Sequence, residues 1–366
     1  MDKKTDMSIL VETFFNTESA PVLSLNIAQG LMENGVDVCA IVTENIENLT
    51  DWKQSFPQES LYIWKSYKNK YFEIIKNGIR IKKQFSSKRF NYVLYPFPFY
   101  RDYLVGRFIK YDENIVIQHD PIPHSGARKR TKKKRLFSTK KDNIVVMSKI
   151  FIPIVEENFH ISKDHIFYLR HGLMKYPEFK GEFSKEELNG KINFLNFGRI
   201  EKYKGLLVLS KAFGELQKQY PDIQLTIAGS GDFSEYKEEY AALNNVTIMN
   251  KYITDDEIAY LFSKPNTVVV LPYLDATQSG VVGMAYNYGT PIIVSDTGGM
   301  KEQLFDGEVG VYVAPGDVDD LQKKMEQFIT DSKIFEKQKL LMQESKEKMS
   351  WTYITKEFLD QIYNHK

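Results

Sequence analysis

The sequence of 366 residues predicts an α/β protein with two doubly wound, Rossmann-like parallel sheets. Short apolar runs alternate with helical patterns along the whole chain, which is the rhythm of βαβ units. The apolar runs are continuous, as in strands that a parallel sheet buries on both faces. A polar stretch at 176–186 divides two such series, so we expect one domain at 1–180 and a second at 181–345.

The first series contains six expected strands, with a helical pattern after the first of them. This pattern covers Val22–Asn34, and Gly35 follows it at a position where a glycine commonly ends a helix. The strands are expected at Ser8–Phe14, Val36–Val42, Tyr92–Tyr95, Asn114–Gln118, Asn143–Met147 and His165–Leu169.

The second series repeats the scheme with six expected strands, and ligands are expected where parallel strands end. From 334 the chain is expected to be helical, with a break near Ser350 and Trp351. The strands are expected at Ile192–Phe197, Gln224–Ala228, Val246–Met249, Thr267–Leu271, Pro291–Val294 and Gly310–Val313. The helices between and after them are expected near 205–219, 232–243, 254–262, 280–288 and 316–330.

The net charge of +1 conceals two halves of opposite sign. Residues 1–180 contain 29 Lys and Arg against 20 Asp and Glu, a net charge of +9, and residues 181–366 carry −8. The basic half therefore suits an anionic surface or polymer. A single cysteine, Cys39, excludes a disulfide framework and fits a reducing compartment. Without a membrane-spanning apolar run or a cleavage signal, the sequence predicts a cytoplasmic protein.

The first candidate ligand site is Gly198–Gly205, directly after a strand of the second series. Arg199 and Lys204 stand there at the carboxyl edge of the sheet. A guanidinium binds a diphosphate through two hydrogen bonds and an ammonium adds a point charge, so the pair suits a diphosphate. The alternative is a solvated loop of charges.

A second candidate is the glycine-rich turn at 228–232, which contains Gly229 and Ser230. It matches the dinucleotide-binding glycine pattern only in part. A tight turn between a strand and a helix needs such glycines without any ligand, and this alternative stays open.

A third candidate is the loop at 272–279, with Asp275 and Gln278 before a helix of small residues. Ser279 stands at the N-cap position of that helix. The amides of Ser279, Gly280 and Val281 are expected to point out of the helix N-terminus, where an anion binds. Capping without a ligand is the alternative.

In the first half, His119 follows the strand Asn114–Gln118 at the corresponding edge. It is a candidate base or a contact to a sugar hydroxyl, and the alternative is a structural histidine. His124 and His171 are weaker candidates. No two histidines have the spacing of metal ligands, so we expect no protein-bound metal.

Two segments of the first half are strongly basic. Tyr67–Phe85 is expected to form a basic amphipathic helix that suits a membrane interface, or else a helix whose apolar side packs on the core above a solvated basic rim. An arm at 128–141 suits anionic lipid headgroups or nucleic-acid phosphates. Its first cations are Arg128, Lys129, Arg130, Lys132, Lys133, Lys134 and Arg135.

These motifs, taken in order, resemble the retaining glycosyltransferases of family four, which have the GT-B fold. The resemblance is strongest over Ile192–Val313, and the first half matches through the helix ending at Gly35 and through His119-Asp120. It rests on Gly198, Arg199, Lys204, Gly205, the Ala-Gly-Ser-Gly turn at 228–231, Tyr288-Gly289-Thr290-Pro291-Ile292-Ile293, Asp296-Thr297-Gly298-Gly299, Asp306-Gly307 and Gly310.

The resemblance implies two domains that face a central cleft and an enzyme of the hexosyltransferase type. It implies transfer, with retention, from a nucleotide-diphosphate sugar to a glycan or lipid-linked saccharide in surface polysaccharide or glycoconjugate synthesis. UDP is the expected nucleotide, and neither a metal nor another cofactor is expected. A helix at 346–366 is expected to return to the first domain.

The resemblance also implies the roles of the site residues. The diphosphate is expected between Arg199, Lys204 and the helix beginning near Gly280, and His119 is expected near the transferring sugar. These three side chains, His119, Arg199 and Lys204, are the implied catalytic residues. The implied donor contacts are Gly198, Gly229, Ser230, Asp275, Gln278, Ser279, Gly280 and Val281.

The sequence departs from the family pattern in two places. The Glu-x7-Glu pair is absent, because its positions are occupied by Ala276 and Met284. Asp275 is the candidate replacement for the first glutamate, which touches the donor sugar. The glycine-rich loop after the first strand is replaced by Asn16–Pro21.

The basic segments add a location and leave alternatives open. With the arm and the amphipathic helix on the acceptor side, we expect a peripheral enzyme on the inner membrane face and no nucleic-acid partner. The alternatives are a nucleotide-sugar epimerase of the same fold and a nucleic-acid-binding protein that uses the arm at 128–141.

Overall fold

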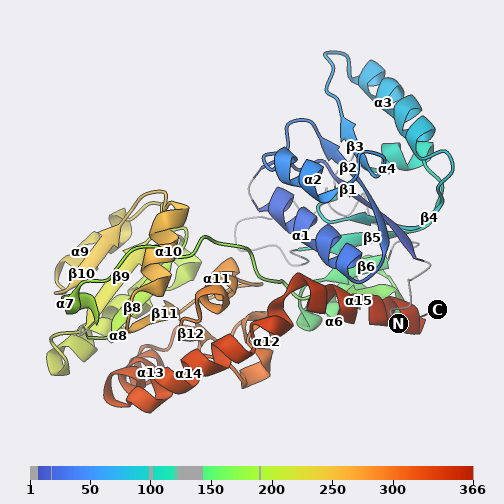
Figure 1. The fold of residues 1–366 in the computed structure, drawn as a ribbon. Coiled ribbons are helices and arrows are strands. Elements are labelled where there is room, and N and C mark those ends of the chain that lie inside the picture. Colours follow the sequence, from blue (N-terminus) through green and yellow to red (C-terminus); the bar gives the residue numbers. More distant parts are fainter. Residues whose placement is uncertain are drawn as a thin grey trace. The chain divides into compact units, whose positions relative to one another are not determined.

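The computed structural model describes residues 7–17, 19–98, 102–119, 121, 143–188 and 191–365. The chain forms two compact units (Figure 1). Unit 1 consists of Met1–Arg170 together with Ser350–Lys366, and unit 2 consists of His171–Met349. The structure draws the division earlier than the polar stretch at 176–186, because Leu173 and Tyr176 already pack on the core of unit 2.

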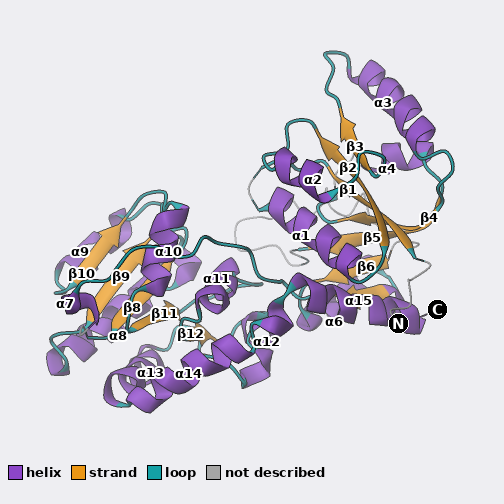
Figure 2. Ribbon diagram, in the orientation of Figure 1, coloured by secondary structure: helices purple, strands orange, loops and turns teal. Residues whose placement is uncertain are grey.

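Unit 1 is built on a seven-stranded parallel sheet in the order β3-β2-β1-β4-β5-β6-β7 (Figure 2). Strand β1 pairs with β2 on one side and with β4 on the other, so the order of the strands reverses between β1 and β4. The strands are β1 (Ser8–Thr13), β2 (Asp37–Thr43), β3 (Leu61–Trp64), β4 (Phe90–Tyr95), β5 (Tyr111–Gln118), β6 (Asn143–Val146) and β7 (Ile166–Tyr168).

Helices cover both faces of this sheet, which explains the continuous apolar strands. Ile9 and Val11 of β1 belong to one core cluster and Leu10 belongs to another, on the opposite face. The first face is covered by α1 (Ala20–Glu33), α2 (Leu49–Ser55) and α15 (Trp351–His365). The second is covered by α3 (Lys70–Gln84), α4 (Asp102–Val105) and α6 (Ile152–Phe159).

Helix α15 belongs to unit 1 although the whole of unit 2 precedes it in the sequence. It packs closely on α1, because a Cβ on Gly30 would lie 2.6 Å from the carbonyl oxygen of Trp351. Phe358 contacts Phe167 edge to face, with ring centroids 6.3 Å apart. The amide of Gln361 bonds the backbone of Tyr168 twice, at 2.9 and 2.8 Å. Unit 1 is therefore made of two separate segments of the chain.

Unit 2 is built on a six-stranded parallel sheet in the order β10-β9-β8-β11-β12-β13. One face packs on α8 (Leu206–Gln219), α9 (Lys237–Ala241) and α13 (Val318–Thr330). The other packs on α10 (Asp255–Ser263), α11 (Gly280–Tyr288), α12 (Met300–Gln303) and α14 (Ser332–Glu344). A short helix, α7 (Lys185–Leu188), precedes the sheet. The strands are β8 (Asn193–Phe197), β9 (Gln224–Ala228), β10 (Val246–Met249), β11 (Thr267–Leu271), β12 (Ile292–Ser295) and β13 (Val311–Val313).

Several elements differ from the sequence expectation, and strand β3 and helix α9 are two of them. Strand β3 was not expected, because four residues between polar segments give too short an apolar run to be recognised. It forms the edge of the sheet by pairing with β2, where Ala40 lies opposite Leu61. Helix α9 is shorter than the expected 232–243. A short turn precedes it, and Phe233 and Tyr236 of this region pack in the core.

Candidate functional site

At the carboxyl edge of the unit 2 sheet, the order of the strands reverses between β8 and β11. These two strands are neighbours, but the chain continues from β8 to β9 on one side and from β11 to β12 on the other. Loops that leave two adjacent strands in opposite directions open a crevice, which is where doubly wound sheets bind ligands. The loops at 198–205 and 272–279, both singled out from the sequence, begin at this point.

The loop after β8 is fastened to the loop after β11. Gly205 has a φ of +70°, and a Cβ on it would lie 1.9 Å from the carbonyl oxygen of Pro272. Beside it, the amide of Leu274 donates to the carbonyl of Tyr203 at 2.7 Å. Only glycine permits this approach, so Gly205 fixes the two loops against each other.

Lys204 is a buried cation at this edge of the sheet. Its side chain is 9% exposed, and Nζ donates to the hydroxyl of Tyr273 at 2.6 Å. Tyr273 is fully buried, and its hydroxyl oxygen also lies 3.2 Å from Oγ of Ser279. A Cβ on Gly198 would lie 3.7 Å from Lys204 Nζ and 3.8 Å from Cγ2 of Val281. The structure thus brings Gly198, Lys204 and the start of α11 together.

The charge of Lys204 is costly where it lies. Burial lowers the pKa of Lys204 to about 8, the like charge of Arg199 adds to the decrease, and Glu201 opposes it. Arg199 itself is exposed on the same loop. A bound anion would restore the electrostatic compensation that water no longer gives this ammonium group.

The N-terminus of α11 is capped by Ser279, as expected, but two of its amides have protein partners. Oγ of Ser279 accepts from Val281 N at 3.3 Å, and Ser279 N donates to Oε1 of Gln303 at 2.9 Å. The expectation of open amides is therefore wrong for Ser279 and Val281. Gly280 is exposed, and nothing lies within 4 Å of where its Cβ would be. This position has room for a ligand beside the first amide of the helix.

The glycines of the turn after β9 serve the packing of the first loop. A Cβ on Gly229 would lie 1.9 Å from the carbonyl oxygen of Gly198, and one on Gly231 would lie 2.5 Å from that of Ile200. The carbonyl of Ser230 accepts from Ile200 N at 2.9 Å. Close backbone packing therefore accounts for these glycines, and a donor contact of Gly229 and Ser230 stays a prediction.

The loop that carries Asp275 and Gln278 is fastened from the side of β12. A Cβ on Gly298 would lie 1.6 Å from the carbonyl oxygen of Ala276, and Gly299 N donates to the carbonyl of Thr277 at 2.9 Å. Asp275 is exposed and Gln278 is half-buried. Their contacts with a donor stay predictions.

His119 lies in unit 1, directly after β5. Nε2 donates to the carbonyl of Pro96 at 2.7 Å, and the ring stacks on Phe97 with centroids 4.2 Å apart. A carbonyl only accepts, so Nε2 carries the proton. His171 belongs to unit 2, where burial lowers its pKa and Nδ1 meets the carbonyl of Gly172 at 2.9 Å.

Some predicted residues lie outside the part of the chain that the structure describes. These are His124 and the cations of the arm, Arg128, Lys129, Arg130, Lys132, Lys133, Lys134 and Arg135. Their roles stay predictions.

Comparison with known families gives a match in unit 2. Residues 179–348 match the family model described as glycosyl transferases group 1. A D-inositol 3-phosphate glycosyltransferase of Arthrobacter sp. (strain FB24) is 31% identical over 132 residues, which are 34% of this chain and 31% of the relative. The match spans about a third of that relative's length, and it confirms the resemblance drawn from the motifs.

Solved glycosyltransferase structures match over nearly the whole chain. Anabaena Alr3699/HepE in complex with UDP and glucose gives a TM-score of 0.68 at 12% identity, covering 98% of this chain and 100% of that one. The lipopolysaccharide outer core galactosyltransferase WaaB in its apo form gives 0.66 at 14%, covering 98% and 99%. At such identities the likeness establishes the fold, which is GT-B, as the resemblance predicted.

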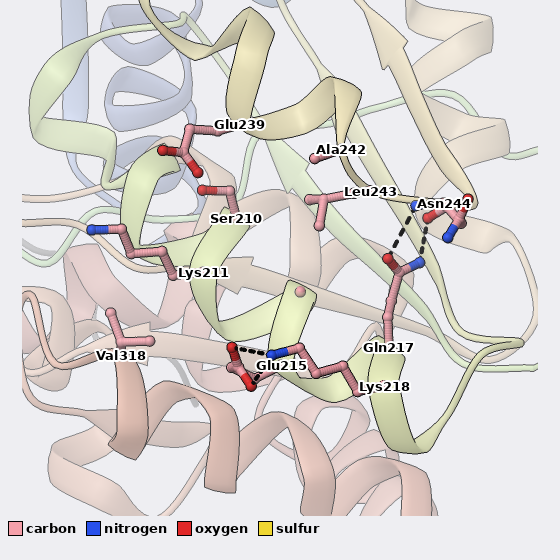
Figure 3. Close-up of a pocket in the computed structure, with 11 residues that line it drawn as sticks. Ser210, Lys211, Glu215, Gln217, Lys218, Glu239, Ala242, Leu243, Asn244 and Val318 are labelled. Atoms are coloured by element: carbon pink, nitrogen blue, oxygen red, sulfur yellow. Dashed lines mark hydrogen bonds and ion pairs between the residues drawn. The ribbon is translucent and has the colours of Figure 1, made fainter.

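A groove elsewhere on this glycosyltransferase segment is separate from the predicted site. It has a volume of about 750 Å³ and lies among α8, α9 and the chain after α9 (Figure 3). Its lining includes the ion pair of Lys218 with Glu215, at 2.7 Å, and the amide of Gln217 that bonds Asn244. None of the predicted site residues lines it.

Two residues that position the site were missed from the sequence. Gln303 of α12 binds both backbone groups of Ser279, since its Nε2 also donates to the Ser279 carbonyl at 3.2 Å. Tyr273 links Lys204 to Ser279. Both act across loops that are far apart in the sequence, so no local pattern marks them.

Proposed function

We propose that this chain transfers a sugar from a UDP-sugar to a saccharide acceptor, with retention of the anomeric configuration. The observation that carries the proposal is the link Lys204–Tyr273–Ser279, which joins a buried cation to the capped N-terminus of α11 at the crevice. Together with the exposed Arg199, it forms a group of donors suited to a diphosphate.

In this proposal, unit 2 holds the donor. The diphosphate lies against Lys204, Arg199 and the amide of Gly280, where a negative charge develops as the sugar leaves. Hydrogen-bond donors that are already oriented in a partly buried site stabilise such charge without reorganising. Because these groups supply the positive charge, the proposal assigns no role to a metal ion.

The transfer step follows from the retention that the family resemblance implies. The acceptor oxygen forms its bond to the anomeric carbon on the face that the diphosphate leaves. The bond between that carbon and the diphosphate oxygen breaks, and this oxygen takes the proton of the acceptor hydroxyl. Arg199 and Lys204 then neutralise the departing diphosphate, and His119 contacts the sugar.

The comparisons support the donor and acceptor classes. The Anabaena structure holds UDP and glucose, and WaaB is named for lipopolysaccharide, a lipid-linked saccharide. We therefore propose UDP as the nucleotide and a glycan or a lipid-linked saccharide as the acceptor.

Ligand-linked thermal stability of the full chain tests the donor side. In the presence of EDTA, we expect UDP to raise Tm more than GDP, ADP or dTDP, because a ligand that binds only the folded state stabilises it. Lys204→Met should abolish the shift and lower transfer from the matching donor by roughly 100-fold or more.

Lys202→Met is the matched control for Lys204→Met. Lys202 lies on the same loop, but its side chain is 84% exposed and pairs with Glu235. It should keep the UDP shift. A panel in which no nucleoside diphosphate raises Tm, or a Lys204→Met protein that responds to UDP like the wild type, would refute the assignment.

A further inference from the structure

One side of α3 is apolar although it faces solvent. Tyr71, Phe72, Ile75 and Ile79 are 82%, 51%, 56% and 63% exposed, and we call these four residues the outer face of α3. At about 100° per residue they lie within one arc of roughly 100° around the helix. The alternative that the apolar side of this helix packs on the core is therefore wrong for these four residues.

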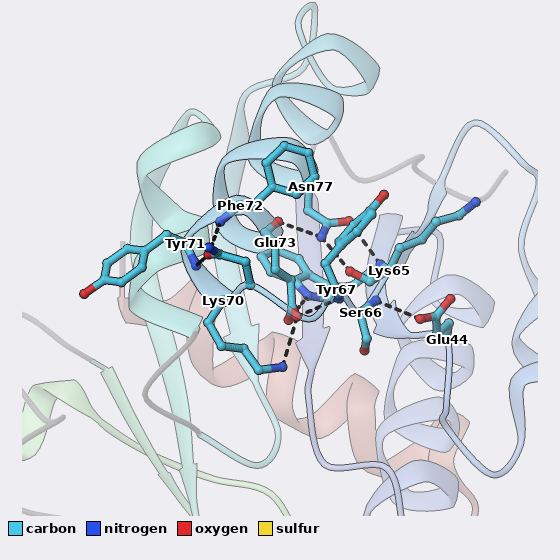
Figure 4. A network of polar contacts seen from close by, with 11 residues as sticks. Glu44, Lys65, Ser66, Tyr67, Lys70, Tyr71, Phe72, Glu73 and Asn77 are labelled. Carbon is cyan, nitrogen blue, oxygen red and sulfur yellow. Dashed lines mark hydrogen bonds and ion pairs between the residues drawn. The ribbon is translucent and has the colours of Figure 1, made fainter.

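Polar residues hold the opposite side of α3 on the sheet (Figure 4). The buried carboxylate of Glu73 accepts from Nε1 of Trp64 at 2.9 Å. The buried amide of Asn77 accepts from the hydroxyl of Tyr62 at 2.8 Å and from Lys65 N at 3.0 Å. These bonds form in one rotation of the helix only, and that rotation turns the apolar residues outward.

One further contact fixes the position of α3, and a cap fixes where it begins. A Cβ on Gly78 would lie 2.4 Å from the ring of Phe108, so the helix sits directly on that ring at this residue. At the other end, the side chain of Asn69 caps the helix by accepting from Tyr71 N and Phe72 N, at 3.0 and 3.2 Å. Figure 4 shows Tyr71 pointing away from the polar network. The exposure of the outer face is thus built into the contacts of the helix.

Cations accompany the outer face of α3. Glu73 is the one acidic residue of the helix, and it is buried and paired with Lys70 at 3.1 Å. Nζ of Lys76 lies over the rings of Tyr67 and Phe72, at 4.8 and 5.1 Å. The exposed cations of the helix and of the segment before it are Lys65, Lys68, Lys70, Arg80, Lys82 and Lys83. The helix thus presents apolar side chains and positive charge, with no exposed carboxylate of its own.

We propose that the outer face of α3 binds the interface of an anionic lipid bilayer. The four apolar side chains enter the boundary of headgroups and acyl chains, and the lysines bind the anionic headgroups. Among the described residues, no helix combines the length and the apolar character needed to cross a bilayer. This surface goes beyond the transfer reaction, and its test does not depend on turnover.

The chemistry of the outer face favours lipid over other polyanions and over a second copy. Ile75 and Ile79 are branched aliphatic side chains, which offer no stacking surface to a base. In a pair of identical copies, the cations of each helix would face those of the other and repel them. A bilayer takes up both the apolar and the charged groups.

Vesicle sedimentation of the full chain tests the proposal. We expect retention on phosphatidylcholine vesicles with about 30% phosphatidylglycerol, weaker retention on phosphatidylcholine alone, and a decrease at high salt. The triple variant Tyr71→Ser, Ile75→Ser, Ile79→Ser should lower the partition coefficient about tenfold or more. Since these side chains are exposed, its Tm and its response to UDP should equal those of the wild type.

The matched control removes exposed apolar residues from unit 2. Ile248, Tyr252 and Leu340 are 42%, 80% and 54% exposed, and their replacement by Ser should leave retention unchanged. Equal retention of the triple α3 variant, as expected if the arm at 128–135 alone bound lipid, would overturn the proposal. The proposal would also be overturned if the wild-type protein did not sediment with the vesicles. It would be overturned as well if the triple α3 variant lost self-association or RNA binding while its retention on vesicles was unchanged.

Discussion

Lys204 carries its charge in a place that disfavours it. Burial lowers its pKa to about 8, so the free protein holds this ammonium group close to the point of losing its proton. A diphosphate favours the charged form, so the pKa in the complex is higher than in the free protein. Binding of the donor and protonation of Lys204 are therefore linked.

This linkage predicts the pH dependence of donor binding. Affinity for UDP should be constant between neutral pH and about pH 8 and should fall as the pH rises further, by about tenfold per unit until the pKa of the complex is reached. Titration calorimetry from neutral to alkaline pH measures the effect, and Lys204→Met should bind weakly at every pH. A flat wild-type profile would contradict the role of Lys204.

At this scale the sequence predicted what is local and missed what is distant. Ser279 was recognised as an N-cap, and Lys204 as a cation of the loop, from their immediate neighbours. Tyr273 is 69 residues from Lys204, and Gln303 is 24 residues from Ser279. Such pairs depend on how the loops meet, which one sequence does not reveal. For the same reason, the amide of Ser279 was wrongly expected to be open, whereas the amide of Val281 is occupied by a local partner, the Ser279 side chain.

At the scale of elements, two glycines of the site have different roles, one in packing and the other in access for a ligand. Gly298 has a φ of +54°, and its Cβ would meet the Ala276 carbonyl at 1.6 Å. Gly280 opens α11, and its Cβ would meet nothing within 4 Å. The first must be glycine for the fold, whereas the second leaves space that the proposed diphosphate occupies.

The two alanine variants should therefore behave differently. Gly298→Ala should lower the free energy of unfolding by about 1–3 kcal/mol or more, because the strained backbone must move. Gly280→Ala should keep Tm, since alanine favours a helix, but should weaken UDP binding. Thermal unfolding and calorimetry measure both. Unchanged UDP affinity in Gly280→Ala would show that the diphosphate does not approach this position.

The order and type of most elements could be predicted from the sequence, whereas the choice between an outward and a core-facing apolar side of α3 could not. Helix α11 was expected at 280–288 and forms Gly280–Tyr288. Apolar runs mark buried strands well because both faces of the sheets are covered. Helix α3 was expected, but a hydrophobic pattern does not reveal that Glu73 and Asn77 are its buried residues. The polar network around them overrides the pattern.

At the scale of the whole molecule, α15 makes the stability of unit 1 depend on a distant segment. Phe358 is fully buried against the core of unit 1, whereas Tyr353 on the same helix is 37% exposed. Phe358→Ala should destabilise unit 1 by about 3–5 kcal/mol, and Tyr353→Ala should have little effect. In Phe358→Ala, amide hydrogen exchange should be faster than in the wild type in the strands β1–β7 and unchanged in the strands β8–β13. Equal acceleration in both sheets would contradict the division into two units.

The return of the chain to unit 1 also sets the order in which the protein can be completed during synthesis. Ser350–Lys366 is translated after all of unit 2, so α1 waits for its partner helix while the intervening segment is made. At bacterial to eukaryotic elongation rates, translation of unit 2 alone takes roughly 10 to 40 s. During it, the apolar side of α1 that later meets Trp351 and Phe358 has no native cover. The nascent first segment of unit 1 therefore exposes apolar surface that favours aggregation until α15 is made.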